Sequence, residues 1–322
     1  MISHILVPLD GSSLAECVLP HVFAIALPNN TKITLLHVLE RPRAKGDQEE
    51  SIDPLEWHLK KREAVIYLEK IAQRFEEANY KVTNVILEGL PADTVIDYAK
   101  NNDVTLIILS THGRGGLSGW NISSVVQKII QRSCKSIFLV RAYKDVSTEP
   151  APIHYKRIFV GLDCSVRAEY ILPTAINLAQ THKGKLILGL VLPKPDILNR
   201  FPPSEEDQQL VAKIVERNHR VASQYFEGLQ KQLTIQGVES QIQLVVSDNV
   251  TTALHDMVDQ VEADLVMMVA HGHTGEGRWP YGGVSTSFIH NGTTSLMIMQ
   301  DMLADEIKQT LAENVASESK GH

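Results

Sequence analysis

The chain has 322 residues, of which 43% are hydrophobic and 21% are charged, and its formal net charge is −7. This profile is typical of a water-soluble globular protein. The acidic balance and the lack of a dense Lys/Arg block argue against nucleic acid or an anionic membrane as a partner. No apolar run approaches the roughly 18 residues that a membrane span needs, and no signal-peptide core follows Met1, so we expect a cytoplasmic protein.

The first half alternates short β-branched apolar segments with longer amphipathic ones, which predicts strands separated by helices. We expect strands at 4–9, 32–39, 82–88, 104–110 and 136–140. We expect helices from Ser12 or Ser13 to about 27, and at 54–79, 91–101 and 123–132. Glu16 stands three residues after Ser13, which is the spacing of a capping box.

The second half repeats the first. ILVPLDGSSLAECVLPHVFAIAL at 5–27 is echoed by IFVGLDCSVRAEYILPTAINLAQ at 158–180, and LIILSTHGRGG at 106–116 by LVMMVAHGHTG at 265–275. The expected strands here are 157–162, 185–192, 240–247, 264–270 and 294–299. The expected helices are 166–181, 205–236, 249–260 and 283–290. Near-continuous apolar strands separated by helices favour parallel sheets covered on both faces, the α/β class.

A repeat of this length is a duplicated domain, because each copy is long enough to bury its own core and far longer than a solenoid unit. We expect a first domain at 1–142, a proline-containing linker at 143–155, a second domain at 156–301 and a polar tail at 302–322. Cys17, Cys134 and Cys164 are scattered and lack CxxC spacing, so we expect reduced, buried thiols and no metal site.

Acidic and glycine residues stand where an open parallel sheet binds ligands, beyond the carboxyl ends of its strands. Asp10 and Asp163 follow the first strand of each half, and glycine-rich loops follow the fourth. Glycine permits positive φ and close approach of a phosphate, and a helix N-terminus attracts anions. This combination indicates a nucleotide site. The patterns GxxxxGK(S/T), GxGxxG after the first strand, and GxSxG are absent, which excludes those site types.

Taken together, ILVPLDGS, LLHVLE, the run into STHGRGG, and SIFLVR resemble a universal stress protein domain. The second half resembles one too, through IFVGLDCS, LGLVLP, the run into AHGHTGEGRWPYGGVS, and SLMIM. The resemblance covers 1–141 and 156–300. It implies two tandem open five-stranded parallel-sheet domains, of the adenine-nucleotide α-hydrolase-like type. It also implies an internal pseudo-dimer formed through 136–140 and 294–299, and association into homo-oligomers.

One branch of this family binds ATP through the pattern G-x2-G-x9-G-(S/T). The pattern falls on Ser110, Gly113, Ser123 and Ser124 in the first half, and on Val269, Gly272, Gly282 and Gly283 in the second. Neither copy is complete: serines replace two glycines in the first, while the second has a stiff valine and lacks the hydroxyl. We therefore expect ATP or AMP, with Mg²⁺ accompanying ATP, mainly in the first half.

The resemblance implies that Asp10 and the Val38 backbone meet the base, and that the loop residues surround the ribose and phosphates. The expected first site is Pro8, Asp10, Val38, Leu109, Ser110, Gly113, Arg114, Gly116, Ser123 and Ser124. The expected second site, the weaker one, is Asp163, Val191, Gly272, Gly282 and Gly283.

Several alternatives remain open at this point. The two aspartates can instead cap the following helices, and the glycines can merely shape a connection. The leading hypothesis is a stress-response protein whose conformation or unknown protein partner responds to an adenine nucleotide. The others are an interaction protein that binds no nucleotide and a slow ATP hydrolase. We assign no catalytic residue, because no water-positioning base or carboxylate pair for Mg²⁺ stands beside the loop.

Overall fold

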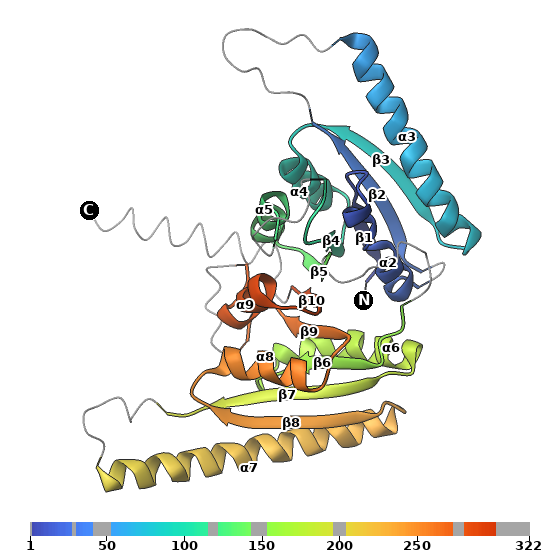
Figure 1. The fold of residues 1–322 in the computed structure, drawn as a ribbon. Coiled ribbons are helices and arrows are strands. Elements are labelled where there is room, and N and C mark those ends of the chain that lie inside the picture. Colours follow the sequence, from blue (N-terminus) through green and yellow to red (C-terminus); the bar gives the residue numbers. More distant parts are fainter. Residues whose placement is uncertain are drawn as a thin grey trace, which may run out of the picture. The chain divides into compact units, whose positions relative to one another are not determined.

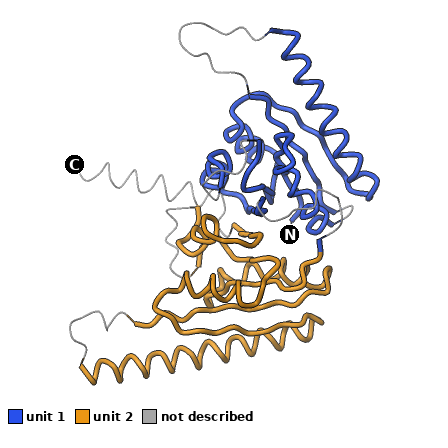
Figure 2. Tube along the Cα trace, viewed as in Figure 1, with its two compact units in different colours: residues 1–153 blue, residues 154–322 orange. Residues whose placement is uncertain are grey.

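The computed structural model describes residues 2–27, 30–40, 53–114, 122–142, 153–195, 204–272 and 280–300. The chain divides into two compact units, unit 1 at 1–153 and unit 2 at 154–322, which are coloured separately in Figure 2. Gly116, the expected tail and most of the expected linker lie outside the described residues.

Unit 1 is an open parallel α/β sheet (Figure 1). Its described strands are β1 (His4–Pro8), β2 (Lys32–Leu39), β3 (Val82–Glu88), β4 (Leu106–Ser110) and β5 (Ser136–Val140). They pair in parallel in the order β3-β2-β1-β4-β5. Its helices are α1 (Ser13–Glu16), α2 (Leu19–Ile25), α3 (Pro54–Glu77), α4 (Pro91–Asn101) and α5 (Ser124–Ser133).

The core of unit 1 lies on both sides of this sheet. Every residue of β4 and β5 is buried, which requires cover on both faces because successive side chains point to opposite sides. Phe23 of α2 stacks on Phe75 of α3 with ring centroids 4.0 Å apart. Arg132 of α5 pairs with Asp93 of α4 at 2.5 Å. The predicted fold class is therefore confirmed for this unit.

Unit 2 repeats the same order of elements. Its described strands are β6 (Arg157–Gly161), β7 (Lys185–Pro193), β8 (Ser240–Ser247), β9 (Leu265–Val269) and β10 (Ser295–Met299). They pair in parallel in the order β8-β7-β6-β9-β10. Its helices are the 3₁₀ helix η1 (Ala168–Ile171), α6 (Leu172–His182), α7 (Glu205–Ile235), α8 (Val250–Gln260) and α9 (Gly283–Asn291). His255 of α8 stacks on Phe288 of α9, with ring centroids 4.0 Å apart.

The first helical segment of each unit is not one continuous α-helix, which corrects the prediction: it is broken in unit 1, and in unit 2 it begins as the 3₁₀ helix η1 and continues as α6. In unit 1, α1 ends at Glu16 and α2 begins at Leu19 with Pro20 in its first turn. In unit 2, Pro173 stands in the same place at the start of α6. Proline has no backbone N–H and clashes with the preceding turn, so it starts a helix more readily than it continues one.

The cysteines do not all fit the expectation of small buried hydrophobes. All three are free thiols; Cys17 is buried, Cys134 is partly buried and Cys164 is exposed. Cys134 and Cys164 adopt positive φ angles of 49° and 62°, because each occupies a tight turn next to a helix. Local turn geometry, rather than hydrophobicity, decides the position of these two residues.

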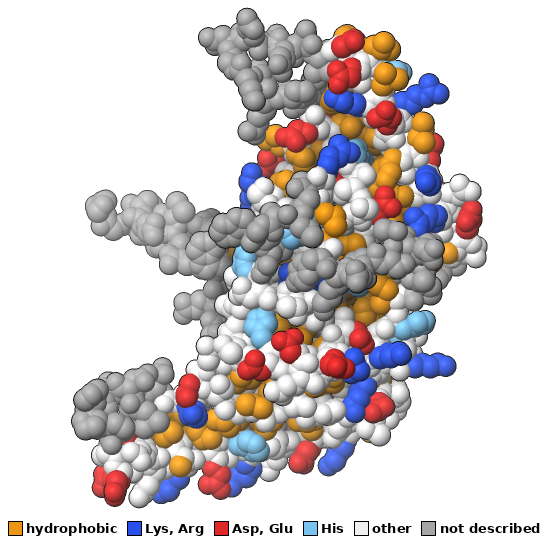
Figure 3. All heavy atoms as spheres, viewed as in Figure 1, with side chains coloured by type: hydrophobic (Ala, Val, Ile, Leu, Met, Phe, Trp, Pro, Cys, Tyr) orange, Lys and Arg blue, Asp and Glu red, His pale blue; other side chains and the backbone are white. Residues whose placement is uncertain are grey.

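The long helices present a mixed charged surface. Figure 3 shows Lys/Arg and Asp/Glu side chains interspersed along α3 and α7. Within the described parts of the chain, no helix combines the length and apolar character needed to cross a membrane.

Candidate functional site

A pocket of about 750 Å³, here called the unit 1 pocket, opens at the carboxyl ends of β1, β2 and β4. The chain winds from β1 outward to β3 and then returns to β4 on the other side, so the pocket lies at the switch point of strand order. Nine of the ten residues expected for the first site line it, and Gly116 lies outside the described residues. The nine are Pro8, Asp10, Val38, Leu109, Ser110, Gly113, Arg114, Ser123 and Ser124.

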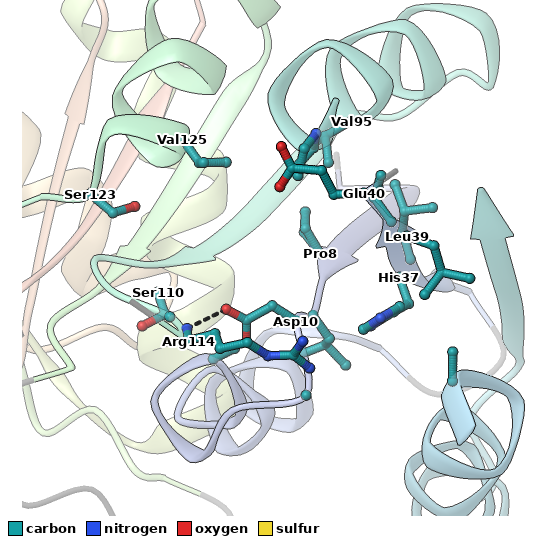
Figure 4. A pocket seen from close by; sticks show the side chains of 18 of the residues that line it. Pro8, Asp10, His37, Leu39, Glu40, Val95, Ser110, Arg114, Ser123 and Val125 are labelled. Carbon is teal, nitrogen blue, oxygen red and sulfur yellow. Dashed lines mark hydrogen bonds between the residues drawn. The ribbon is translucent and has the colours of Figure 1, made fainter. Parts of the chain in front are cut away.

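The Asp10 carboxylate joins the loop after β1 to the loop after β4. Its Oδ1 accepts hydrogen bonds from the Ser12 N–H at 3.0 Å and the Ser12 hydroxyl at 2.6 Å. Its Oδ2 accepts from the Arg114 backbone N–H at 2.5 Å, the bond drawn dashed in Figure 4. This clamp between two loops already uses most of the acceptor capacity of Asp10.

The same arrangement recurs in unit 2 and decides between two roles for the aspartates. Asp163 Oδ1 accepts from the Ser165 N–H at 3.0 Å. The Ser12 and Ser165 hydroxyl oxygens accept from the N–H groups of Ala15 and Ala168, each at 3.1 Å. The serines therefore bond to the first helical turn, and the aspartates orient the serines. The alternative that Asp10 and Asp163 cap the helices is wrong, and so is the expected Ser13–Glu16 capping box, because Ser12 is the cap.

Gly113 and Gly272 are needed for a reason other than backbone freedom. Neither has positive φ, which corrects the expectation for these glycines. A Cβ at either position would lie 2.1 Å from Oδ2 of Asp10 or Asp163 respectively. Each glycine thus makes room for the aspartate carboxylate beside it.

Ser110 closes the base of the unit 1 pocket. It is buried, and its Oγ accepts from the Cys17 thiol at 3.4 Å and from the His112 backbone N–H at 3.4 Å. A serine is therefore accommodated where the family pattern has glycine, since its hydroxyl is satisfied inside the protein.

The N-terminus of α5 faces the same pocket. Ser123 is the N-cap, its Oγ accepting from the Val126 N–H at 3.4 Å, and its own N–H bonds to the Thr111 carbonyl at 2.8 Å. Ser124, the first residue of α5, is exposed. The free N–H groups of the first turn and the helix dipole favour an anion here.

Titratable side chains from β2, α3 and the loop after β4 line another wall. Burial lowers the pKa of His37, and the Arg114 cation acts in the same direction, while the Leu9 backbone and Asp10 oppose them. Burial also raises the pKa of Tyr67, and the nearby Glu16 carboxylate adds to this effect. At neutral pH the pocket therefore presents an uncharged imidazole and a protonated phenol.

The corresponding pocket of unit 2 is smaller, about 330 Å³. All five residues expected for the second site line it, namely Asp163, Val191, Gly272, Gly282 and Gly283. Val269 lines it as well, and its carbonyl accepts from the Ser285 hydroxyl at 2.9 Å. The N-cap of α9 is Gly282, which offers no side-chain hydrogen bond.

Comparisons with known proteins show to which family the chain with these two pockets belongs. A model of the universal stress protein family matches residues 1–141 and 154–300, which is most of both units. The chain belongs to the universal stress protein family. Because the family matches twice, it is a tandem member, as the internal repeat predicts.

Individual relatives agree with this assignment. The universal stress protein MJ0577 of Methanocaldococcus jannaschii is 30% identical over 155 residues, which cover 44% of this chain and 96% of that protein. A putative universal stress protein from Pseudomonas aeruginosa has a TM-score of 0.67 at 15% identity, covering 96% of this chain and 97% of its own. A universal stress protein from Archaeoglobus fulgidus has a TM-score of 0.62 at 16% identity, and the match covers 94% of this chain and 100% of that protein. The two structures support the fold alone.

The pocket of this universal stress protein also contains residues that the sequence argument did not single out. Trp57, Lys60 and Tyr67 of α3 line it, together with His37 of β2. The family pattern concerns only the strand ends and the loop after β4, so it says nothing of α3. Comparison of the two repeats could have identified His37, because the matching residue of unit 2 is the apolar Leu190. Among the described residues, no three His, Cys, Asp or Glu side chains are grouped to hold a metal.

Proposed function

We propose that this tandem universal stress protein binds an adenine nucleotide, ATP or AMP, in the unit 1 pocket, and that binding regulates its conformation or its interaction with a protein partner. The observation that carries the proposal is the convergence of two features on one pocket of about 750 Å³. The clamped Asp10–Arg114 loop forms one side and the N-terminus of α5 forms another. Pockets of roughly 300–1,000 Å³ are the size range of small-molecule and cofactor sites.

The base and the phosphates of a nucleotide each have a suitable counterpart in this pocket. The apolar side chains of Pro8, Val38 and Leu109 offer a surface for a base. Ser123 and Ser124 and the first-turn N–H groups of α5 suit a phosphate, and Arg114 adds a guanidinium that can bind phosphate oxygens. With ATP, Mg²⁺ would be bound by the phosphates and water, since it keeps several water ligands in such sites.

The proposal assigns nucleotide to unit 1 in preference to unit 2. The unit 2 pocket has less than half the volume, about 330 Å³ against about 750 Å³. Val269 replaces a small residue at its base, and Gly282 and Gly283 lack the hydroxyls of Ser123 and Ser124. The bulkier side chain at the bottom of the unit 2 pocket and its fewer hydrogen-bond donors both disfavour binding of a polyphosphate.

The proposed role is regulatory binding without catalysis. A nucleotide that binds one conformation more tightly shifts the population toward it by the difference in binding free energy. The expected pairing of the two domains, further association of chains and a cytoplasmic location stay predictions.

The test uses a matched pair of substitutions at the two helix N-termini. Ser124→Glu places a carboxylate at the first position of α5, where it stabilises the helix dipole but repels phosphate. Gly283→Glu makes the same change at the matching, exposed position of α9. We expect Ser124→Glu to weaken ATP binding about tenfold or more, and Gly283→Glu to leave it unchanged, in a calorimetric titration of nucleotide-stripped protein.

Unfolding curves of both variants show whether the fold is intact, and we expect no loss of stability in either. Equal weakening by both substitutions, or an effect of Gly283→Glu alone, would place the site elsewhere. Failure of the wild-type protein to bind ATP or AMP at millimolar concentration would favour the alternative of a nucleotide-independent interaction protein.

A further inference from the structure

One buried polar atom in the wall of the unit 1 pocket, Nδ1 of His37, has no hydrogen-bond partner. The His37 and Tyr67 rings meet edge to face, with centroids 6.0 Å apart, and both residues line the pocket. An unpaired buried polar atom is uncommon because it costs free energy, so the position of His37 Nδ1 on a pocket wall points to a bound group.

His37 is the better placed of the two for contact with a ligand. Its side chain is only 7% exposed. In Figure 4 its ring extends from β2 into the pocket, toward Asp10 and the Arg114 side chain. It directly precedes Val38, whose backbone is the expected partner of a base. The Tyr67 ring packs against it and holds its orientation.

Unit 2 has no equivalent of this polar position. The Leu9 N–H bonds to the Leu36 carbonyl, and the Leu162 N–H bonds to the Gly189 carbonyl, so Leu190 matches His37. The tyrosine on the long helix recurs as Tyr225, whose hydroxyl donates to Glu169 at 2.9 Å, as Tyr67 interacts with Glu16 in unit 1. The unpaired imidazole is thus a feature of the unit that has the larger pocket.

The chemistry of the imidazole determines which group it would recognise. Burial, which lowers the pKa of His37, leaves the ring neutral at physiological pH, with one N–H and one lone pair. The ring interacts with the Leu9 backbone by a hydrogen bond, and Nδ1 has no partner. We therefore assign the N–H to Nε2, which leaves the lone pair on Nδ1.

We propose that His37 selects the base of the bound nucleotide, its Nδ1 accepting a hydrogen bond from the exocyclic amino group of adenine. A base with a carbonyl at that position would bring two acceptors together and be disfavoured. This inference rests on the proposed nucleotide site and adds a residue that decides between adenine and 6-oxopurine nucleotides.

The experiment compares ATP with inosine triphosphate, which differs in carrying a carbonyl in place of the amino group. Nucleotide-stripped full-length protein is titrated calorimetrically with each. The wild-type protein is expected to prefer ATP about tenfold. His37→Leu, which introduces the residue that unit 2 has at this position, is expected to weaken ATP binding about five- to tenfold and to change inosine triphosphate binding less than about twofold.

Two further measurements separate recognition from a structural role. His37→Leu removes both the unpaired Nδ1 and the ring's hydrogen bond to the Leu9 backbone, so its unfolding midpoint should stay close to that of the parent while its affinity for ATP falls. His21→Leu removes another buried histidine that does not line the pocket, and it should leave the preference for ATP unchanged.

An unchanged ATP preference in His37→Leu, or equal weakening of both nucleotides, would overturn the role of His37 while leaving the nucleotide site intact. A wild-type protein that binds neither nucleotide would overturn the nucleotide site itself, and the role of His37 with it.

Discussion

Each pocket depends on a single carboxylate and on the glycine beside it. Asp10 bonds to Ser12 and to the Arg114 N–H, and its Oδ2 occupies the space that a Cβ of Gly113 would need. Asp163 and Gly272 repeat this contact in unit 2. The family pattern predicts these residues, but glycine at such positions predicts positive φ, which neither Gly113 nor Gly272 has. The true reason, close approach across two loops, depends on contacts between distant segments and cannot be read from local sequence.

The clamp predicts that a methyl group at these glycines is costly. Gly113→Ala and Gly272→Ala should each lower the free energy of unfolding by about 1–3 kcal/mol, because the added methyl group displaces the carboxylate from its hydrogen bonds. Gly283→Ala is the control, since no atom lies within 4 Å of its added Cβ. Urea unfolding of the three variants measures the effect, and equal stability of Gly113→Ala and Gly283→Ala would contradict the clamp.

A buried histidine predicts how stability depends on pH. Burial lowers the pKa of His21 from 6.5 to about 4. Between these values the unfolded chain binds a proton that the folded protein does not, so stability falls as the pH drops below 6.5. From neutral pH to about pH 5, His21 should account for about 2 kcal/mol of lost stability. His21→Leu should lose correspondingly less over this interval in urea unfolding, and an identical loss in parent and variant would contradict the assignment.

At the scale of elements, hydrophobic periodicity and the positions of turn residues and prolines predict most of the helices and strands. β2, β3, α4 and β5 have the predicted bounds, because turn residues or prolines mark their ends. The discontinuous first helical segments were missed, since the apolar pattern continues through Pro20 and Pro173. The wall formed by α3 was also missed: Trp57 and Tyr67 reach the pocket only through tertiary packing.

The N-terminus of α5 yields a prediction about its cap. Ser123→Ala should lower the free energy of unfolding by about 1 kcal/mol or somewhat less, because the Oγ–N distance to Val126 is a long 3.4 Å. Ser124→Ala is the neighbouring control, since Ser124 lies inside the helix and alanine is the better helix former. Thermal unfolding should rank Ser123→Ala below Ser124→Ala, and the reverse ranking would show that Ser123 does not cap.

For the whole molecule, duplication turns differences between the copies into evidence about function. Both units keep the sheet order, the bond from serine to aspartate and the glycine that the aspartate requires. They differ at the pocket: Ser110, Ser123, Ser124 and His37 in unit 1 are matched by Val269, Gly282, Gly283 and Leu190 in unit 2. A conserved scaffold with one altered pocket is consistent with one ligand-binding unit and one unit kept for its structure. Family membership alone names neither the ligand nor the partner.

The most direct measurement of this asymmetry is the stoichiometry of ATP binding to nucleotide-stripped, full-length protein by isothermal titration calorimetry. We expect one ATP per chain, with the affinity weakened about tenfold or more in Ser124→Glu and unchanged in Gly283→Glu. Two equivalent sites per chain would contradict the asymmetry, and no binding at millimolar ATP would contradict the nucleotide site itself.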